Sequence, residues 1–383
     1  MDDSNVPSTI VIAHVLYSFD EVGGLENGVV NLINNLSTNR FKHIICALTR
    51  VGDLKNRVRI KDVQYYSLNK HDNNDLSLPI SLWKIFRNHH VDVVHLRNWP
   101  TMVEGYTAAR LANVKNVIYS EHGRHFEDID EGRKLNTIIK KYIFNHVDLL
   151  LAVSKQLGIE MKQVYSLKRD IRVIPNGVDT DKFCPIFKPM IKKQLVLNND
   201  ELVVGTVSRL DKVKNLDRFF REAIRNNFSA KILVVGDGPE KDGLEKLVKQ
   251  LGVRDQIIFL GNRQDIPEII NCMDIFILPS KSEGMSNVVL EAMSCGVPVV
   301  AFDVGGNREL IDHDLGGGLV TQNNFDDFFK KLKQLACSPE IRANMGEYNR
   351  EKVVNSFSIG HMAKAYTALY DGNIDQYVYL SKT

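Results

Sequence analysis

The sequence predicts two α/β domains in succession, each a doubly wound parallel sheet covered by helices. The first observation is length, because 383 residues exceed the size at which a chain usually keeps one hydrophobic core. The second is a repeated order of short apolar, β-branched runs with helical patterns between them, which is typical of parallel sheets buried on both faces. The third is that this series occurs twice along the chain.

Twelve runs account for the expected strands, six in each half of the chain. In the first half they cover residues 9–16, 43–49, 92–96, 116–122, 148–154 and 172–177. In the second half they cover residues 202–208, 231–238, 256–261, 275–280, 298–302 and 317–320. Between the halves, the stretch DTDKFCPIFKPMIKKQ (179–194) has two prolines and a basic cluster but no strand or helix period.

We therefore place the domain join in this stretch. The expected first domain covers residues 1–184 and the second covers 185–357. Apolar positions after residue 358 predict a terminal helix over 358–383, which we expect to pack back on the first domain.

Composition excludes several classes of protein. The chain is 44% hydrophobic and 25% charged, as in ordinary globular proteins, and its net charge of +2 gives no signal for nucleic acid. Five scattered cysteines without a Cys-x-x-Cys pair predict buried free thiols in a reducing compartment. The start MDDSNVPSTI is unlike a signal peptide, and the apolar runs are shorter than the roughly 20 residues that span a bilayer. We expect a cytoplasmic protein.

Metal binding is not expected. Three Asp-x-Asp pairs have the spacing for a divalent ion, but none directly follows an apolar strand, so solvated loop acids are favoured. These pairs are Asp128/Asp130, Asp179/Asp181 and Asp312/Asp314.

Ligands of doubly wound sheets bind beyond the carboxyl ends of the strands, so the residues there are candidates. Arg209 and Lys214 follow one strand and could clamp a diphosphate, or equally be two solvated surface charges. Gly236 and Gly238 follow the next strand, where they allow either a ligand or only a tight turn. A dinucleotide fingerprint would need a third glycine where Lys241 stands, which disfavours a dinucleotide oxidoreductase.

Two carboxylates mark the stretch SEGMSNVVLEAMSC (282–295). A helix from Ser286 to Cys295 would be apolar almost all round and should be buried, yet Glu291 lies in its middle. A buried carboxylate needs a partner, and ribose hydroxyls would suit it, while Glu283 could accept hydrogen bonds from a sugar and the helix N-terminus could bind phosphate. The alternative is a capped helix whose glutamate is bonded to a neighbouring arginine.

The first half carries further polar residues at its expected strand ends. Gly23 and Gly24 lie between a strand and a helix, where they form either a phosphate loop or a plain loop. His122 and His125 follow another strand, and a lone histidine there is more often structural than catalytic. A third strand end carries residues that touch either substrate or nothing: His95, Arg97 and Asn98.

Taken in chain order, these motifs resemble family-4 glycosyltransferases with the GT-B fold, in which two Rossmann-like domains face each other across a cleft. SEGMSNVVLEAMSCGVPVVA resembles the family signature with its two glutamates, and GGLENGVVNL resembles its glycine loop. VIPNGVDTDKF resembles the segment at the domain join, and VSRLDKVKN with VVGDGPEKDGLEKL resembles the diphosphate-binding elements. Three stretches further resemble sugar transferases of exopolysaccharide clusters associated with the PEP-CTERM/exosortase system: HVLYSFDEVGGLENGVVNLIN, VVHLRNW and SEHGRH.

The resemblance implies a hexosyltransferase that moves a sugar from a nucleotide-diphosphate sugar to an acceptor hydroxyl, with retention of configuration and without a required metal. Arg209 and Lys214 would hold the diphosphate, and His122 would lie near the reacting sugar. Glu283 would bind the sugar hydroxyls and Glu291 the ribose. The other implied donor-binding residues are Gly23, Gly24, Asn262, Arg263, Gly284, Met285, Ser286 and Asn287. Where the family often has Gly-Phe or Gly-Leu after the first glutamate, this chain has Gly284-Met285, so the resemblance does not predict which sugar is transferred.

A UDP-sugar is the favoured donor, and a GDP-sugar would also fit. The expected acceptor is a saccharide or a lipid-linked saccharide, and the expected product a bacterial surface polysaccharide or glycolipid. A nucleotide-sugar epimerase or phosphorylase of the same fold, and a non-catalytic nucleotide-sugar-binding subunit, remain as alternatives. Residues 81–90 and 135–147 mix basic and aromatic side chains, which suits peripheral contact with the inner face of the cell membrane, or equally a core with a solvated rim.

Overall fold

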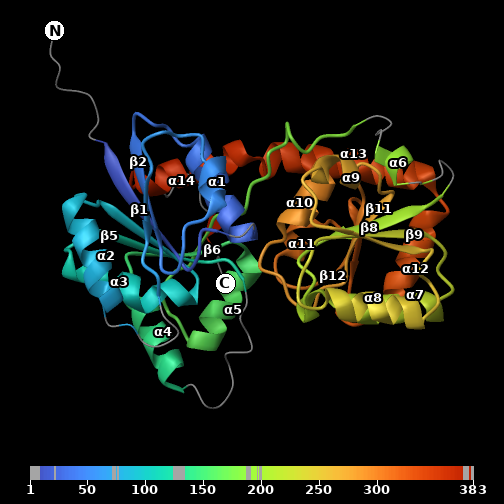
Figure 1. Cartoon of the computed structure of the whole chain (residues 1–383), viewed down its shortest axis with the longest axis horizontal. Coiled ribbons are helices and arrows are strands. Elements are labelled where there is room, and N and C mark those ends of the chain that lie inside the picture. Colours follow the sequence, from blue (N-terminus) through green and yellow to red (C-terminus); the bar gives the residue numbers. More distant parts are fainter. Residues whose placement is uncertain are drawn as a thin grey trace, which may run out of the picture. The chain divides into compact units, whose positions relative to one another are not determined.

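The computed structural model describes residues 9–20, 23–70, 75, 77–123, 134–186, 191–195, 197, 201–373 and 379–380. The chain divides into two compact units (Figure 1). Unit 1 comprises Met1–Asn176 together with Ile359–Thr383, and unit 2 comprises Gly177–Ser358.

Unit 1 is built on an eight-stranded sheet with the order β14-β7-β6-β5-β4-β1-β2-β3. All neighbouring strands are parallel except β14 and β7. The strands are β1 (Ile10–Leu16), β2 (Phe41–Ala47), β3 (Gln64–Ser67), β4 (Val93–Arg97), β5 (Asn116–Glu121), β6 (Leu149–Ala152), β7 (Arg172–Val173) and β14 (Tyr379–Leu380). The six strands expected in this half are confirmed. Strand β3 was not predicted because its sequence, QYYS, lacks the apolar run of its neighbours.

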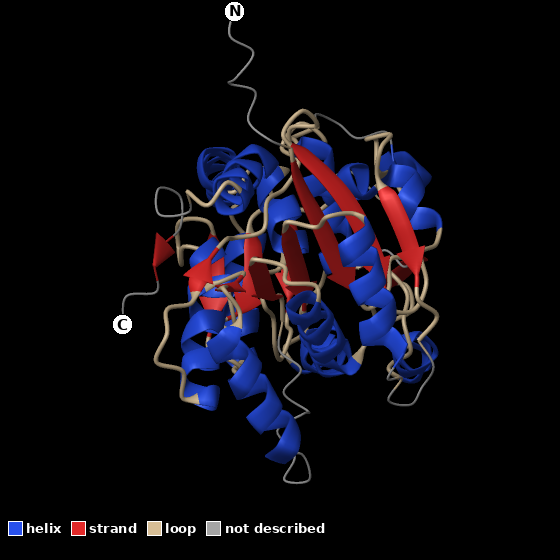
Figure 2. Cartoon of the chain, turned by 90° about the vertical axis from the view of Figure 1, so that its left-hand side faces the viewer, coloured by secondary structure: helices blue, strands red, loops and turns tan. Residues whose placement is uncertain are grey.

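Helices cover both faces of this sheet (Figure 2). They are α1 (Gly24–Asn35), α2 (Ser77–Asn88), α3 (Met102–Leu111), α4 (Lys134–His146), α5 (Lys155–Tyr165) and α14 (Ile359–Tyr370), with short 3-10 turns η1 (Asp53–Arg57) and η2 (Trp99–Thr101). Helices α1 and α14 share one core with the sheet, in which Leu32, Met362 and Tyr366 pack against Ile12. Helix α14 ends at Tyr370 and does not run to residue 383 as expected, and a short strand follows it.

Unit 2 has a six-stranded parallel sheet with the order β10-β9-β8-β11-β12-β13. The strands are β8 (Val203–Val207), β9 (Lys231–Val235), β10 (Ile257–Gly261), β11 (Ile275–Leu278), β12 (Val299–Phe302) and β13 (Gly317–Val320), and all six were expected. The helices are α6 (Ile191–Gln194), α7 (Leu216–Arg225), α8 (Lys241–Gln250), α9 (Ile266–Ile270), α10 (Asn287–Ser294), α11 (Asn307–Leu310), α12 (Phe325–Ala336) and α13 (Pro339–Ser356), with a 3-10 turn η4 (Lys212–Lys214).

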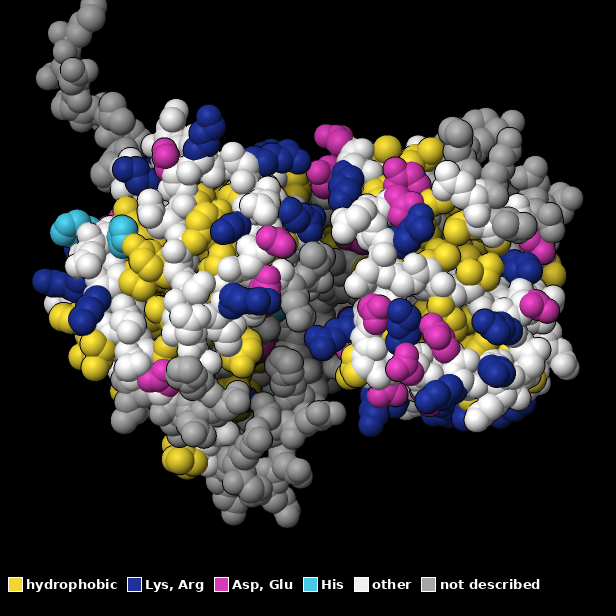
Figure 3. Space-filling model, in the orientation of Figure 1, with side chains coloured by type: hydrophobic (Ala, Val, Ile, Leu, Met, Phe, Trp, Pro, Cys, Tyr) yellow, Lys and Arg dark blue, Asp and Glu magenta, His cyan; other side chains and the backbone are white. Residues whose placement is uncertain are grey.

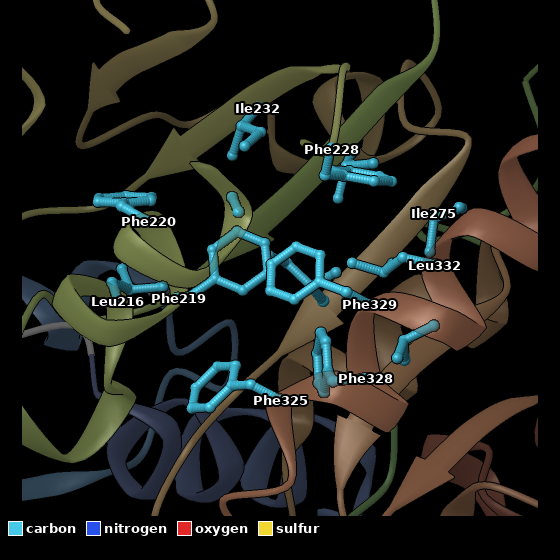
Figure 4. Close-up of a cluster of buried hydrophobic side chains, with 14 of the residues drawn as sticks. Leu216, Phe219, Phe220, Phe228, Ile232, Ile275, Phe325, Phe328, Phe329 and Leu332 are labelled. Carbon is cyan, nitrogen blue, oxygen red and sulfur yellow. The ribbon is translucent and has the colours of Figure 1, made fainter. Parts of the chain in front are cut away.

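The core of unit 2 is rich in phenylalanine (Figure 4). The rings of Phe219 from α7 and Phe329 from α12 stack with their centroids 5.2 Å apart. Phe328 adds an edge contact to Phe302 of β12 at 5.1 Å. Buried aromatic rings contribute large apolar areas, so this cluster holds α7 and α12 on one face of the sheet and leaves the strand ends for polar residues.

The boundary between the units lies after Asn176, earlier than the expected residue 184. The segment that follows is bonded to unit 2. Arg350 Nη1 donates to the carbonyl oxygens of Thr180 and Phe183 at 2.9 and 2.8 Å. Ser294 Oγ also donates to the Phe183 carbonyl at 2.6 Å. These contacts join residues far apart in sequence and hold the segment after Asn176 to unit 2.

On the face drawn in Figure 3, basic and acidic side chains of the described residues are interspersed, as the small net charge predicts. Among the described residues, no helix has the length and apolar character needed to cross a bilayer. Each sheet has one topological switch point, between β1 and β4 in unit 1 and between β8 and β11 in unit 2. Ligands of such sheets bind at these points, beyond the carboxyl ends of the strands.

Candidate active site

An ion pair lies at the switch point of unit 2. Lys214 ends the turn η4 after β8, and Glu283 follows the neighbouring strand β11. The Nζ atom of Lys214 is 2.7 Å from Oε1 of Glu283, and both side chains are largely buried, at 19% and 10% exposure. The Asp211 side chain accepts hydrogen bonds from the backbone N–H groups of Val213 and Lys214, which shapes the turn that presents the lysine. The structure thus brings together two residues that the sequence analysis assigned to donor binding.

Two hydrogen bonds to backbone carbonyl oxygens join the loop after β8 to the loop after β11. The Lys281 N–H donates to the Val213 carbonyl oxygen at 2.8 Å. The side-chain amide of Asn215, a residue that is only 1% exposed, donates to the Pro279 carbonyl oxygen at 3.2 Å. The Asn215 bond is buried, so the two bonds together hold the two loops in one arrangement that places Lys214 beside Glu283.

The loop after β12 supports the backbone of Glu283 from the other side. Gly306 N–H donates to the Gly284 carbonyl oxygen at 2.7 Å. Gly305 has φ +53°, and a Cβ atom there would lie 1.8 Å from the Glu283 carbonyl oxygen. Only glycine permits this approach, so Gly305 allows the loop after β12 to pack against the backbone of Glu283.

Arg209 lies two residues after the end of β8, on the same loop as Lys214, and it is exposed. Its guanidinium has no hydrogen bond or ion pair with another residue of the described part of the chain. The interpretation of Arg209 and Lys214 as two independent solvated charges is therefore wrong for Lys214, which is paired.

Helix α10 is less enclosed than its sequence suggests. Its buried side chains face α13 and the sheet, whereas Asn287, Val288 and Glu291 are half-buried along the opposite side. The expectation of a fully buried Glu291 is corrected here, because Glu291 shares the half-buried side of the helix with Asn287 and Val288. Met285 and Ser286, at 5% and 4% exposure, lie buried just before the helix.

Gly236 and Gly238 have a structural explanation. Their φ angles are +125° and +158°, and a Cβ atom on Gly236 would lie 1.9 Å from the Ser208 carbonyl oxygen. A Cβ atom on Gly238 would lie 2.4 Å from the Leu210 carbonyl oxygen. The two glycines let the loop after β9 pack on the loop after β8. The tight turn alone therefore explains why glycine stands at both positions.

Asn262 and Arg263, expected near the nucleotide base, follow the edge strand β10. Asn262 is exposed. Arg263 forms a two-bond ion pair with Asp265, with Nε to Oδ1 at 2.8 Å and Nη2 to Oδ2 at 2.6 Å. Strand β9 separates these residues from the Lys214–Glu283 pair in the sheet order, so they belong to a more distant part of the same edge.

In unit 1, His122 directly follows β5. Its backbone N–H donates to Oδ1 of Asn98 at 2.9 Å, while its Nε2 atom is buried without a hydrogen-bond partner among the described residues. Burial first, and the nearby charge of Arg97 second, lower the pKa of His122 to about 3. The imidazole is therefore neutral at physiological pH. The neighbouring candidate His125 lies outside the described residues.

Glu121, one residue earlier, was not singled out in the sequence. The hydroxyl of Tyr119 donates to its Oε2 at 2.8 Å. Burial raises the pKa of the Glu121 carboxyl to about 7, against the opposing effect of the Tyr119 hydrogen bond. A carboxyl group that titrates near neutrality at a strand end is a functional candidate, and its signal in the sequence is only its place beside His122.

His95 and Arg97 lie in the core of unit 1. His95 is fully buried and is hydrogen-bonded through Nδ1 to the Tyr370 hydroxyl at 2.8 Å. Arg97 is 2% exposed, and its Nη1 lies 3.0 Å from Nδ1 of His14. Both residues therefore join β4 to the rest of the core. The sequence analysis considered substrate contact or no contact for them, and the structure adds this role in the core.

Gly23 and Gly24 stand at the start of α1. Neither has a positive φ. A Cβ atom on Gly23 would lie 2.2 Å from Oε2 of Glu26, so the missing side chain makes room for this carboxylate. Phosphate binding at the two glycines stays a prediction.

The Asp-x-Asp pairs within the described residues have structural contacts. Asp179 accepts from the backbone N–H groups of Asp181 and Lys182. Asp312 accepts from Lys352 at 2.8 Å, and Asp314 pairs with Lys331. In the described part of the chain, no group of three or more His, Cys, Asp or Glu side chains is arranged to hold a metal ion. The pair Asp128/Asp130 lies outside the described residues.

Comparison with known proteins decides the family. Residues 22–182 match the family described as Glycosyltransferase Family 4, and residues 187–352 match Glycosyl transferases group 1. The Escherichia coli protein named UDP-Gal:alpha-D-GlcNAc-diphosphoundecaprenol alpha-1,3-galactosyltransferase is 32% identical in an alignment of 299 residues that covers 74% of this chain and 76% of that protein. The chain belongs to this glycosyltransferase family.

Further comparisons agree with this assignment. N-acetyl-alpha-D-glucosaminyl L-malate synthase of Bacillus anthracis is 28% identical over 80% of this chain and 82% of that protein. The crystal structure of Anabaena HepE in complex with UDP has a TM-score of 0.80 at 20% identity, over 95% of this chain and all of that one. The GT-B fold and the enzyme class expected from the sequence are confirmed. The association with exopolysaccharide clusters stays a prediction.

Proposed function

We propose that this glycosyltransferase transfers a hexose from a UDP-sugar to a saccharide or lipid-linked saccharide, with retention of configuration and without a required metal. The single observation that carries the proposal is the Lys214–Glu283 pair at the switch point of unit 2, with Arg209 on the same loop. A UDP donor is supported by the UDP-Gal in the name of the E. coli relative and by the UDP bound to the Anabaena structure. A role in surface polysaccharide or glycolipid synthesis is supported by the diphosphoundecaprenol in that relative's name.

In this proposal, the bond between the sugar C1 and the diphosphate oxygen breaks with its electron pair going to the diphosphate. Arg209 and Lys214 stabilise the negative charge that grows there. The acceptor oxygen bonds to C1 from the same face, and its proton goes to the departing phosphate oxygen. Glu283 holds the ammonium of Lys214 in place and accepts hydrogen bonds from sugar hydroxyls, so one carboxylate orients both groups.

The remaining assignments follow the open side of α10. Asn287 and Glu291, which are half-buried on this side, are assigned to the nucleoside, with the ribose hydroxyls bonded to the carboxylate. In unit 1, neutral His122 is assigned to the surroundings of the reacting sugar, where its buried Nε2 atom would gain a hydrogen-bond partner.

Thermal unfolding in metal-free buffer tests the donor site. A nucleotide at 100 times its dissociation constant should stabilise unit 2 by about 2.7 kcal/mol. We expect UDP to raise the melting temperature, and GDP, ADP, CMP and NAD to act less. The variants Lys214→Ala and Glu291→Ala should lose most of this response. Lys212→Ala is the matched control, because Lys212 is an exposed cation of the same turn. An equal response in Lys214→Ala and wild type would contradict the proposed site.

Turnover distinguishes the alternatives. NMR of the product should show retained anomeric configuration, and an inverted product would refute the mechanism. Conversion of the donor without an acceptor would favour an epimerase, and a requirement for phosphate would favour a phosphorylase. Nucleotide binding without turnover across an acceptor panel would favour a non-catalytic subunit.

We also propose peripheral contact with an anionic membrane through one side of α4. Leu135, Ile138 and Tyr142 are 68%, 64% and 56% exposed, and their spacing places them on one side of the helix. The helix contains no acidic residue, and Lys141 is exposed beside the three, which complements anionic lipid. Other aromatic residues of the two basic stretches, Phe86 and Phe144, are buried in the core instead.

Co-sedimentation with vesicles tests this contact. The wild type should bind vesicles that contain phosphatidylserine and should bind neutral phosphatidylcholine vesicles less. The double variant Leu135→Glu/Ile138→Glu should lose this binding, whereas Ile159→Glu/Val164→Glu on α5 should retain it, since these residues are exposed at 39% and 42% on another helix. Equal binding by both variants would contradict the assignment to α4.

A further inference from the structure

Asn98 has a backbone conformation that is almost reserved for glycine. It follows β4 and precedes η2, with φ 60° and ψ 163°. In this region the Cβ atom of an ordinary residue crowds the backbone, and such residues persist only where their surroundings hold them. Residues of this kind gather at functional sites, so an asparagine here needs an explanation.

Four hydrogen bonds hold Asn98 in this conformation. Its backbone N–H donates to the Ser120 carbonyl oxygen at 3.0 Å. Its carbonyl oxygen accepts from the backbone N–H and the hydroxyl of Thr101, at 3.2 and 3.1 Å. Its side-chain Oδ1 accepts from the backbone N–H of His122 at 2.9 Å. The residue therefore links the end of β4 to the end of β5 and to the turn that begins α3.

The contact with His122 joins two unfavourable features in one place. Asn98 is strained, and the His122 Nε2 atom is buried without a partner among the described residues. Buried polar atoms in native proteins are normally paired, and an exception often marks a site that pairs with a ligand. Glycine would adopt the backbone conformation of residue 98 freely, but it has no oxygen to accept from His122.

We propose that Asn98 is a positioning residue for sugar transfer: it fixes the backbone of His122, and so the direction of the imidazole, at the end of β5. This inference rests on the proposed function, in which His122 lies beside the reacting sugar. Asn98 itself is not assigned to contact the sugar. The strain at residue 98 is retained because the strained backbone brings Oδ1 to the His122 N–H.

The variant Asn98→Gly separates positioning from stability. Glycine relieves the backbone strain and removes Oδ1, so the melting temperature should stay equal to that of the wild type or rise. The kcat for sugar transfer should fall about 10- to 100-fold, because a misplacement of about 1 Å has effects of this size. The KM for the donor should change little. The matched control is Asn113→Gly, since Asn113 also has a positive φ, 62°, but is exposed at the end of α3. This control should keep the wild-type kcat.

A double-mutant cycle with His122→Ala shows whether Asn98 acts through His122. In the His122→Ala background, Asn98→Gly should cause no further loss of kcat, because the side chain being positioned is gone. Additive losses would overturn the inference, as would a wild-type kcat in Asn98→Gly or a loss of kcat accompanied by a lowered melting temperature. If the wild type itself transfers no sugar, both the proposed function and this inference are refuted. An active wild type with an equally active Asn98→Gly refutes the inference alone.

Discussion

Acid should destabilise unit 1 through its buried histidines. His14, His43, His95 and His122 lie on β1, β2 and β4 and at the end of β5, on the sheet face covered by α1 and α14. Arg97 is the cation among them, and Tyr366 and Tyr370 of α14 lie against His95. Burial is the largest cause that lowers the pKa of each histidine, and the charge of Arg97 is the second. All four are therefore neutral in the folded state.

The size of the effect follows from proton linkage. The pKa of His43 is lowered from 6.5 to about 4 and that of His122 to about 3. Between pH 7 and pH 5 the unfolded chain takes up these protons and the folded chain does not, so each histidine removes about 1.8 kcal/mol from the free energy of unfolding. This stability is fully present above the unfolded pKa and is lost as the pH falls below it. His14 and His95 act in the same direction.

Glu121 opposes this loss. Its folded pKa is raised from 4.5 to about 7, so the folded state takes up this proton first as the pH falls. Over the same interval it adds about 2 kcal/mol to the free energy of unfolding. The wild type should therefore lose more than about 1.5 kcal/mol from pH 7 to pH 5, and Glu121→Gln should lose about 2 kcal/mol more than the wild type.

Urea unfolding followed by tryptophan fluorescence at pH 7, 6 and 5 measures these losses. Both tryptophans of the chain, Trp83 and Trp99, belong to unit 1, so the signal reports that unit. Unit 2 contains a single histidine, His313, which is exposed. A wild type whose stability is constant or rises toward pH 5 would refute the reasoning, and so would equal pH slopes for the wild type and Glu121→Gln.

Three further predictions concern unit 2 and the thiols. Gly305→Ala should lower the free energy of unfolding by more than about 3 kcal/mol, because the new Cβ would overlap the Glu283 carbonyl oxygen. Gly252→Ala, with a similar φ and open space around its Cβ position, should cost about 1–2 kcal/mol. Urea unfolding followed by far-UV circular dichroism compares the two, because both glycines lie in unit 2, which has no tryptophan. Arg350→Met should lower the free energy of unfolding by about 3 kcal/mol and speed tryptic cleavage at Lys182, since Arg350 Nη1 donates to the carbonyl oxygens of Thr180 and Phe183. An unchanged cleavage rate would contradict this role. In native protein, iodoacetamide should label exposed Cys337 well before Cys46 and Cys295, whose thiol pKa values burial raises to about 12; mass spectrometry of the peptides checks the order, and early labelling of Cys46 would contradict it.

Local patterns in the chain were sufficient to predict most of the strands and to propose candidate site residues. The apolar runs of both sheets could be located because strands buried on both faces are apolar over their whole length. Arg209, Lys214, Glu283 and His122 could be found because they follow such runs, and parallel strands share one carboxyl edge. Strand β3 escaped because it is short and half-exposed, so the same pattern is missing.

The sequence by itself determined the fold class, the positions of the apolar strands and which polar residues stand at their ends, because these depend on side-chain periodicity within a few residues. Only the tertiary structure decided which of those residues meet. Lys214 and Glu283 are 69 positions apart and pair because β8 and β11 are neighbours in the sheet. The left-handed Asn98, the neutral histidines and the open side of α10 likewise depend on what packs around them. Burial and pairing are set by segments distant in the chain, and no local pattern encodes them.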